Sequence, residues 1–176
     1  KVKKYFRYLL YVLGILVILS ISLLAYVYYN KAQLLKSITT AMSETLHASV
    51  KAEDLTATFF NDFPRISLSL INTEVHDSLF NIYHTPLIKA DKIFLRTDIA
   101  GLIFKRININ SFKIKNASFT IFKTPSGYSN DYIFRKIDSD TVKKEKGKSN
   151  VDLNIEEIIF ENVKVAMRDS LKGKQY

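Results

Sequence analysis

The stretch Phe112-Lys113-Ile114-Lys115-Asn116-Ala117-Ser118-Phe119 carries, in eight residues, the pattern that decides the fold. Apolar and polar side chains alternate up to Ile114, and the alternation resumes one position out of phase with Ala117 and Phe119. A period of two is typical of a β-strand with one apolar face. The change of phase predicts that the strand kinks at Asn116, either through a β-bulge or through a left-handed backbone conformation of the asparagine.

Two other stretches repeat this pattern around an asparagine. Residues 158–165 (IIFENVKV) align with residues 112–119, and residues 68–75 (LSLINTEV) align more loosely. The apolar phase changes again, at Asn162 and at Asn72. Strands that bend in this way predict a sheet that curls instead of lying flat.

The rest of the chain after Ser49 also favours strands. Alternating segments run from Leu55 to Phe59, from Ile66 to Leu70 and from Ile93 to Ile99, with turn-forming residues between them. Short helical turns are expected near Pro86–Ala90, Ala100–Phe104 and Asp131–Lys136. We expect an α+β, mainly β fold built on a curved antiparallel sheet. With so few helices to cover its apolar face, the sheet either closes as a barrel filled by its own side chains or remains an open groove.

The N-terminal segment predicts a membrane anchor. A run of 22 uncharged residues, Tyr8 to Tyr29, follows a basic tail formed by Lys1, Lys3, Lys4 and Arg7. As a helix it spans roughly 30 Å, the thickness of a hydrocarbon core, and tyrosines mark both of its ends. The four cations place the N-terminus in the cytoplasm and the remaining chain across the membrane. The length of the run argues against a cleavable signal peptide, and the lack of a polar face argues against a buried core helix.

The helical pattern continues after the span, from Lys31 to about His47, with apolar residues at intervals of three and four. This amphipathic helix is expected to pack on its own domain or to lie on the membrane interface.

Composition excludes several classes of function. The net charge of +9 is concentrated in the N-terminal tail and in residues 143–148, which argues against a nucleic-acid groove. The chain has no cysteine, and His47, His76 and His84 lack the spacing of a zinc site. The sequence His76-Asp77-Ser78 holds triad residue types, but adjacent strand residues point to opposite faces. No enzyme activity, metal or cofactor is therefore expected.

The order of segments resembles the N-terminal region of AsmA-like envelope proteins. The resemblance rests on the basic tail, the single span and the amphipathic helix, followed by Phe63-Pro64-Arg65-Ile66-Ser67-Leu68, Asn72-Thr73-Glu74-Val75 and Ala90-Asp91-Lys92-Ile93. Residues 109–122, with Gly127-Tyr128-Ser129-Asn130 after them, are similar to the family's strand, glycine turn and Ser/Asn pattern. The chain looks most like the versions found in Bacteroidetes-type Gram-negative cells.

This resemblance implies a periplasmic protein anchored by its N-terminus in the inner membrane. It implies a taco-shaped β-groove, similar to that of chorein-type bridge lipid-transfer proteins, which moves phospholipid toward the outer membrane and serves envelope assembly. The expected partners are the phospholipid bilayer and its lipids, and further inner-membrane or envelope subunits, without nucleic acid. The alternative is a structural or interaction subunit whose anchor and exposed strand edge dock an envelope complex and carry no lipid.

In the lipid-groove hypothesis, the apolar residues on the concave side of the sheet line the groove. These candidates are Leu55, Ala57, Phe59, Leu68, Leu70, Ile93, Leu95, Phe112, Ile114, Phe119, Ile121, Ile158 and Phe160.

Four regions are expected along the chain. Residues 1–30 form the cytoplasmic tail and the anchor, and residues 31–137 the amphipathic helix and the first part of the groove. Residues 138–150 are polar and charged and predict a flexible loop, while residues 151–176 supply further groove strands. Because members of the resembled family are several times longer, the 176 residues are expected to be part of a longer protein.

Overall fold

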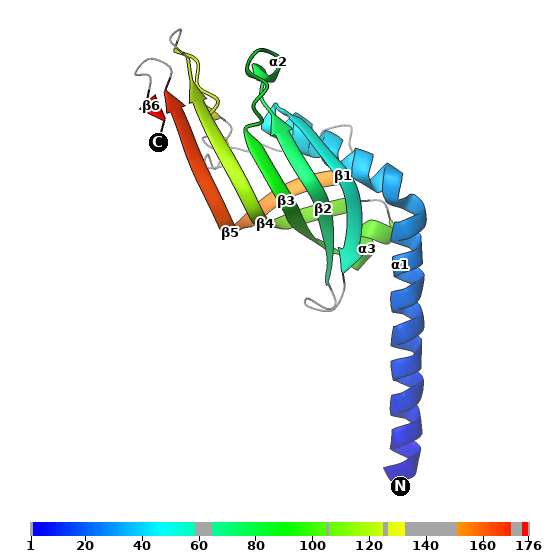
Figure 1. Cartoon of the computed structure of the whole chain (residues 1–176). Helices are drawn as coiled ribbons and strands as arrows, with labels where there is room; N and C mark the ends of the chain where they lie inside the picture. The colour runs from blue at the N-terminus through cyan, green and yellow to red at the C-terminus, as the bar shows by residue number, and fades with distance from the viewer. Residues whose placement is uncertain are drawn as a thin grey trace.

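The computed structural model describes residues 2–58, 65–104, 106–124, 127–132, 151–169 and 174–175 (Figure 1). Its elements, in chain order, are α1 (Val2–Leu46), β1 (Ser49–Thr58), β2 (Arg65–His76), α2 (Phe80–Tyr83), β3 (Ile88–Asp98), α3 (Ile99–Ile103), β4 (Ile107–Lys123), β5 (Val151–Asp169) and β6 (Lys174–Gln175). The expected α+β, mainly β class is confirmed. Lys1, Phe59 and the predicted loop 138–150 lie outside the described residues.

One six-stranded sheet contains every strand, in the order β1-β2-β3-β4-β5-β6. All neighbouring strands are antiparallel except β4 and β5, which are parallel. The prediction of a wholly antiparallel sheet was therefore wrong. The physical reason lies in the connection: 27 residues, 124–150, separate the two strands, and parallel neighbours need a dozen or more residues to return to the starting end.

The three asparagines marked by the change of phase all have a left-handed backbone. The φ angles are 47° for Asn72, 52° for Asn116 and 54° for Asn162. Residues on both sides of two of these kinks share the apolar face, since Leu70 and Thr73, and likewise Ile114 and Ala117, are buried. The predicted kinks are therefore confirmed, in their left-handed form.

These kinks line up across the sheet. Glu53, Asn72, Asp91, Asn116 and Asn162 occupy equivalent positions in β1 to β5, and the strand register is the same on both sides of this row. A bulge would instead shift the register. Such a shift does occur in β4, between Ile109 and Ser111, against both β3 and β5.

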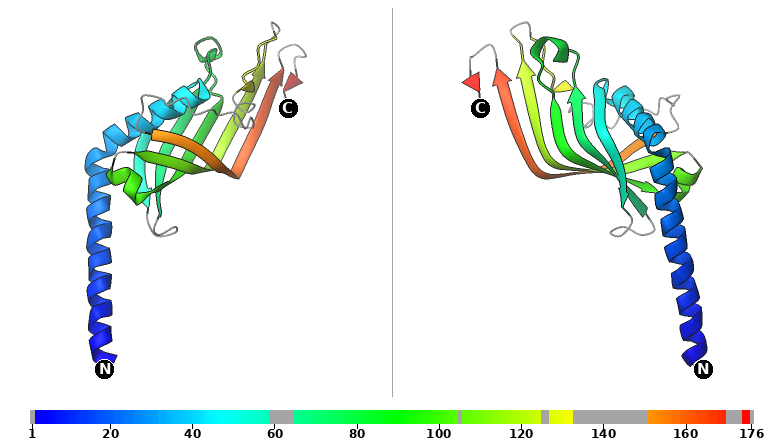
Figure 2. Two further views of the ribbon diagram at one scale, coloured as in Figure 1. Left: turned by 180° about the vertical axis from the view of Figure 1, so that it is seen from behind. Right: turned by 45° about the vertical axis from the view of Figure 1, so that its right-hand side comes forward.

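The sheet curls around the second half of α1. Figure 2 shows β4 and β5 bending sharply, so that the orange first part of β5 runs back toward the helix. As a result α1 contacts both β1, at one edge of the sheet, and β5, four strands away in the sheet order. Strands that bend at bulges and left-handed residues give this shape without breaking the hydrogen-bonded ladder.

Helix α1 is continuous from Val2 to Leu46 and therefore joins the predicted span to the predicted second helix. It ends where His47 takes a φ of 51°, the left-handed conformation common at helix C-termini. Between these ends its exposure changes: most side chains before Leu23 are exposed, whereas Leu34, Ile38, Ala41 and Met42 are buried. In the described part of the chain, α1 is the one helix long and apolar enough to cross a membrane.

The core lies between this buried side of α1 and the apolar face of the sheet. Ile38 from the helix, Leu68 and Leu70 from β2, and Leu95 from β3 are fully buried in one hydrophobic cluster.

Of the predicted helical turns, the one near Ala100–Phe104 is confirmed as α3. The prediction of a helical turn near Pro86–Ala90 was wrong, because β3 begins at Ile88. The helical turn lies earlier in the chain and is α2. The turn near Asp131–Lys136 falls largely outside the described residues.

Candidate functional site

Among the described residues, α1 covers one side of the apolar face of the sheet, and large apolar side chains at the other side are exposed. On β5, Phe160 is 54 % exposed, Val165 64 % and Met167 48 %. Their register partners on β4 are Ile114, Phe119 and Ile121, of which the first two are buried. The ring of Phe160 also packs edge-on against that of Phe119, with the ring centres 5.7 Å apart. The exposed residues of β5 thus continue the core surface outward, and we call Phe160, Val165 and Met167 the open apolar strip.

The predicted groove residues divide between the core and this open part. Eight of them are buried in the core cluster: Leu55, Leu68, Leu70, Ile93, Leu95, Phe112, Ile114 and Phe119. Ala57, Ile121 and Ile158 are half-buried, and Phe160 is exposed. Phe59 lies outside the described residues. Protein atoms already surround the first eight, so Phe160 is the predicted residue most accessible to a ligand.

Two residues of the open apolar strip, Val165 and Met167, were missed as site candidates. The signal was present in the sequence, because both follow Asn162 in the phase that the kink sets. The alternation predicts the face of the sheet on which each side chain lies, but it does not predict which strands α1 covers and which it leaves exposed.

The outer edge of β5 is nearly unpaired. Strand β6 pairs only with Arg168 and Asp169, and between Leu153 and Met167 no other strand of the described residues lies along that edge. An unpaired edge presents backbone N–H and C=O groups that can accept another strand.

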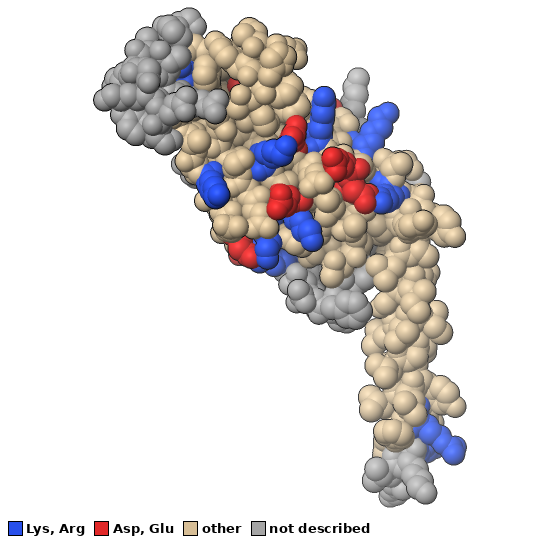
Figure 3. All heavy atoms as spheres, in the orientation of Figure 1, with Lys and Arg blue, Asp and Glu red and all other residues tan. Residues whose placement is uncertain are grey.

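The opposite face of the sheet is polar and rich in ion pairs. Figure 3 shows Lys and Arg interspersed with Asp and Glu over the sheet, whereas the long straight part of α1 carries charge only near its lower end. Glu161 on β5 binds Lys113 and Lys115 of β4, at 2.7 and 2.6 Å. These two hydrogen-bonded lysines lower the pKa of Glu161 to about 2. Mixed charge of this kind keeps the outer face in water.

The corner near α2 brings together polar groups that do not form a catalytic arrangement. Nε2 of His76 lies 3.0 Å from Oε2 of Glu74, and its ring stacks on Phe80. The Asp77 and Ser78 side chains instead contact the hydroxyl of Tyr128, at 3.3 and 3.1 Å. Burial, as the main cause, raises the pKa of Tyr128 to about 12. His76 therefore pairs with Glu74, whereas Asp77 and Ser78 share the Tyr128 hydroxyl, and no hydrogen bond between the side chains of 76–78 is formed in this arrangement.

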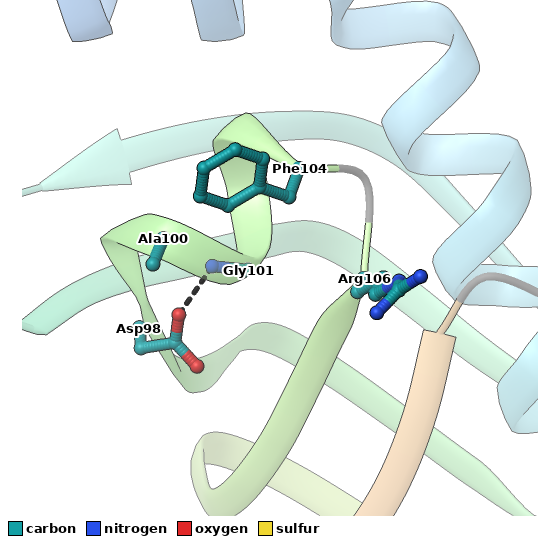
Figure 4. A pocket seen from close by; sticks show the side chains of 5 residues that line it. All are labelled: Asp98, Ala100, Gly101, Phe104 and Arg106. Carbon is teal, nitrogen blue, oxygen red and sulfur yellow. Dashed lines mark hydrogen bonds between the residues drawn. The ribbon is translucent and has the colours of Figure 1, made fainter.

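A second exposed apolar corner lies at α3, beside the chain's long helix. Ile103 is 55 % exposed and Phe104 74 %. Asp98, Ala100, Gly101, Phe104 and Arg106 line an open depression there (Figure 4). The Asp98 carboxylate accepts a hydrogen bond from the backbone N–H of Gly101 and so caps α3. A Cβ on Gly101 would lie 2.7 Å from the carbonyl oxygen of Arg106, so this tight turn requires glycine.

Within the described residues, no group of three or more His, Asp or Glu side chains is placed to hold a metal ion. The features that remain are the apolar helix, the open apolar strip, the free edge of β5 and the α3 corner.

The fold and these surfaces define a class of protein: a single long apolar helix continuous with a mixed β-sheet whose apolar face is only partly covered. Comparisons with protein-family models, with curated proteins and with solved structures found no match.

Proposed function

We propose that this chain is a membrane-anchored, lipid-binding protein of AsmA-like type, with its N-terminus in the cytoplasm and its sheet in the periplasm. In this proposal α1 crosses the inner membrane, and the sheet forms the membrane-proximal end of a hydrophobic groove. That groove carries phospholipid toward the outer membrane and so serves envelope assembly.

The observation that carries the proposal is the open apolar strip. Large exposed apolar side chains on a sheet face mark a surface that another apolar molecule covers. Here they continue a buried apolar face without interruption, from Phe119 to Phe160 and Val165. An acyl chain laid along the strip leaves water at a gain of roughly 25 cal/mol per Å² of apolar area. The headgroup would remain at the solvated margin, and this binding consumes no cofactor.

A site-specific photocrosslinker tests the binding surface. Placed at Val165, which lies on the apolar face and is 64 % exposed, it is expected to capture phospholipid. Placed at the adjacent Lys164, which is exposed on the other face, it is expected to capture little. Because both positions lie in β5, they share local backbone structure. Equal labelling at the two positions would contradict a sided lipid surface.

A matched pair of charge substitutions gives an independent test. Val165→Asp places a carboxylate in the lipid path at an exposed site, so folding should be retained while the purified protein retains less phospholipid. Lys164→Asp serves as the control and should leave lipid retention unchanged. The measurement is mass spectrometry of lipids extracted from equal amounts of each 176-residue protein.

The alternative function is that of an interaction subunit, favoured by the outer edge of β5, along which the described residues place only the two-residue strand β6. In that case a partner strand continues the sheet and its side chains cover the open apolar strip. The crosslinker at Val165 would then capture one polypeptide in place of phospholipid, and Val165→Asp would not alter lipid retention.

A further inference from the structure

We propose that the α3 corner, formed by Ile103, Phe104 and Arg106, is a second membrane contact that inserts into the interface of the bilayer crossed by α1. This inference rests on the membrane span of the proposed function and is independent of whether the open apolar strip binds lipid.

The first observation is the depth at which α3 meets α1. The hydroxyl of Tyr26 donates a hydrogen bond of 3.4 Å to the carbonyl oxygen of Leu102 in α3. Tyr26 lies three residues before Tyr29, the end of the apolar run, which is about 4.5 Å along a helix axis. The headgroup and interfacial layer on each side of the hydrocarbon is itself several Å thick. Tyrosine rings near the end of a span place their hydroxyl groups at the headgroup level. The Leu102 carbonyl bonded to the Tyr26 hydroxyl therefore lies at the boundary between hydrocarbon and headgroups.

The second observation is that protein covers α1 further down still. Leu23, three residues deeper in the apolar run than Tyr26, is only 9 % exposed and Val27 only 3 %, whereas nearly all side chains before Leu23 are exposed. Leu102 belongs to the same hydrophobic cluster and is fully buried. Figures 1 and 2 show α3 beside α1 in each view, at the end of the straight part of the helix. The end of the sheet thus reaches the level of the membrane boundary.

The third observation is the chemistry that α3 presents there. Leu102 faces the protein, but Ile103 and Phe104 are 55 % and 74 % exposed. In the sequence two basic residues, Lys105 and Arg106, follow them directly. Apolar side chains next to basic ones suit the boundary between acyl chains and anionic headgroups. In water, Ile103 and Phe104 would leave a large apolar surface uncovered.

Figure 4 shows why this corner is built to present these residues. The Asp98 cap and the close approach of Gly101 to Arg106 hold α3 in a short, tight turn. The turn leaves Phe104, the C-cap residue that follows α3, outside the core. A fixed turn loses little conformational entropy when it enters the interface.

Because the chain contains no tryptophan, a single introduced tryptophan reports on this site alone. The 176-residue chain with Phe104→Trp is reconstituted into vesicles of phosphatidylcholine and phosphatidylglycerol, with or without bromine on the acyl chains. The expected result is loss of most of the tryptophan emission in the brominated vesicles. The matched control is Ile82→Trp, a 66 % exposed apolar position in another short helix, α2, which is expected to lose little emission.

Each outcome is decisive. Emission that is equal in the two kinds of vesicle overturns the membrane contact, and a blue-shifted emission that bromine does not quench shows contact with protein instead. If circular dichroism shows that Phe104→Trp does not fold, the same quenching experiment is carried out with Ile103→Trp and has the same outcomes. Flotation of the vesicles separates this inference from the anchor: protein that floats while its tryptophan stays unquenched has a spanning helix but no α3 contact.

Discussion

The side-chain amide of Asn162 donates a 2.7 Å hydrogen bond to Oδ1 of Asn116, the residue opposite it on the neighbouring strand. Both residues have a left-handed backbone, with φ angles of 54° and 52°. At the β1 edge of the sheet, the side-chain amide of Asn72 in β2 likewise donates a 2.7 Å hydrogen bond to the carboxylate of Glu53 in β1. The kinks are therefore tied to their neighbours by side chains as well as by register.

Replacing Asn116 by valine is expected to lower the free energy of unfolding by roughly 1–2 kcal/mol, the cost of a left-handed backbone at a residue other than glycine. The β-branched side chain adds crowding, and the bond to Asn162 is lost. Asn116→Gly should be tolerated better, because glycine adopts positive φ freely. Thermal unfolding of the full chain in detergent measures both.

The matched control for this pair is Asn108→Val, at an exposed position of the same strand whose φ is not positive. The midpoint temperature of thermal unfolding should change little in Asn108→Val. A similar loss at positions 108 and 116 would show that any valine on β4 is harmful and that the kink has no special requirement.

Replacing Thr73 by valine is expected to stabilise the fold by about 1 kcal/mol, because a buried hydroxyl without a partner is exchanged for a methyl group. Thr73 is fully buried after the first kink, and its Oγ1 has no hydrogen-bond partner within the described residues. Thr56→Val, at an exposed site of β1, is the control and should be nearly neutral. A loss of stability at position 73 would mean that the hydroxyl is satisfied, for instance by a buried water.

Protonation of Glu161 should weaken the sheet only in strong acid. The lysines at 113 and 115 lower its pKa from an ordinary 4.5 to about 2, so the ionised form is favoured by folding. The contribution of this carboxylate to the free energy of unfolding is therefore complete above about pH 4.5 and is lost as the pH falls toward 2. The carboxyl carbon signal of Glu161 in NMR is expected to titrate with a midpoint near pH 2. In Lys113→Ala or Lys115→Ala this midpoint should lie at a higher pH.

The control for the titration is Lys164→Ala, which removes a cation from β5 that makes no ion pair with Glu161 in the structure. High salt should also raise the midpoint, because exposed ion pairs are screened. A midpoint near 4.5 in the unaltered protein would refute the double lysine contact.

The proposed orientation in the membrane rests on the basic tail. A reporter fused after Tyr176 is expected to be active in the periplasm and inactive in the cytoplasm. Neutral substitutions at Lys1, Lys3, Lys4 and Arg7 should reduce that preference, since cations ahead of a span set its direction. Cytoplasmic activity of the unaltered fusion would overturn the proposed localisation.

The sequence predicted the features that leave a local mark. A left-handed residue reverses the phase of alternation, so Asn72, Asn116 and Asn162 could be recognised before any coordinates. The apolar run of α1 and the turn at α3 are equally local. The same reasoning gave the side of the sheet on which Leu70 or Ile114 lies, and both are buried.

Features that depend on distant segments were not predicted. The parallel pairing of β4 with β5 depends on the path of residues 124–150, whose sequence carries no strand pattern to indicate it. Coverage by α1 depends on how far the sheet curls, so the sequence placed Leu68 and Phe160 in one groove. In the structure Leu68 is fully buried and Phe160 is half exposed.

The unbroken backbone of α1 joins the proposed anchor directly to the helix half that packs on the sheet. Its 45 residues have a helical path of roughly 68 Å, which bends between a straight first half that is apolar and exposed and a second half held in the core (Figure 1). A helix longer than the local hydrocarbon is thick accommodates the mismatch by tilting. Because the helix is continuous through the bend, we expect a tilt of the first half to swing the second half and the sheet with it. In the proposed orientation, the thickness of the bilayer therefore sets the direction in which the open side of the sheet points.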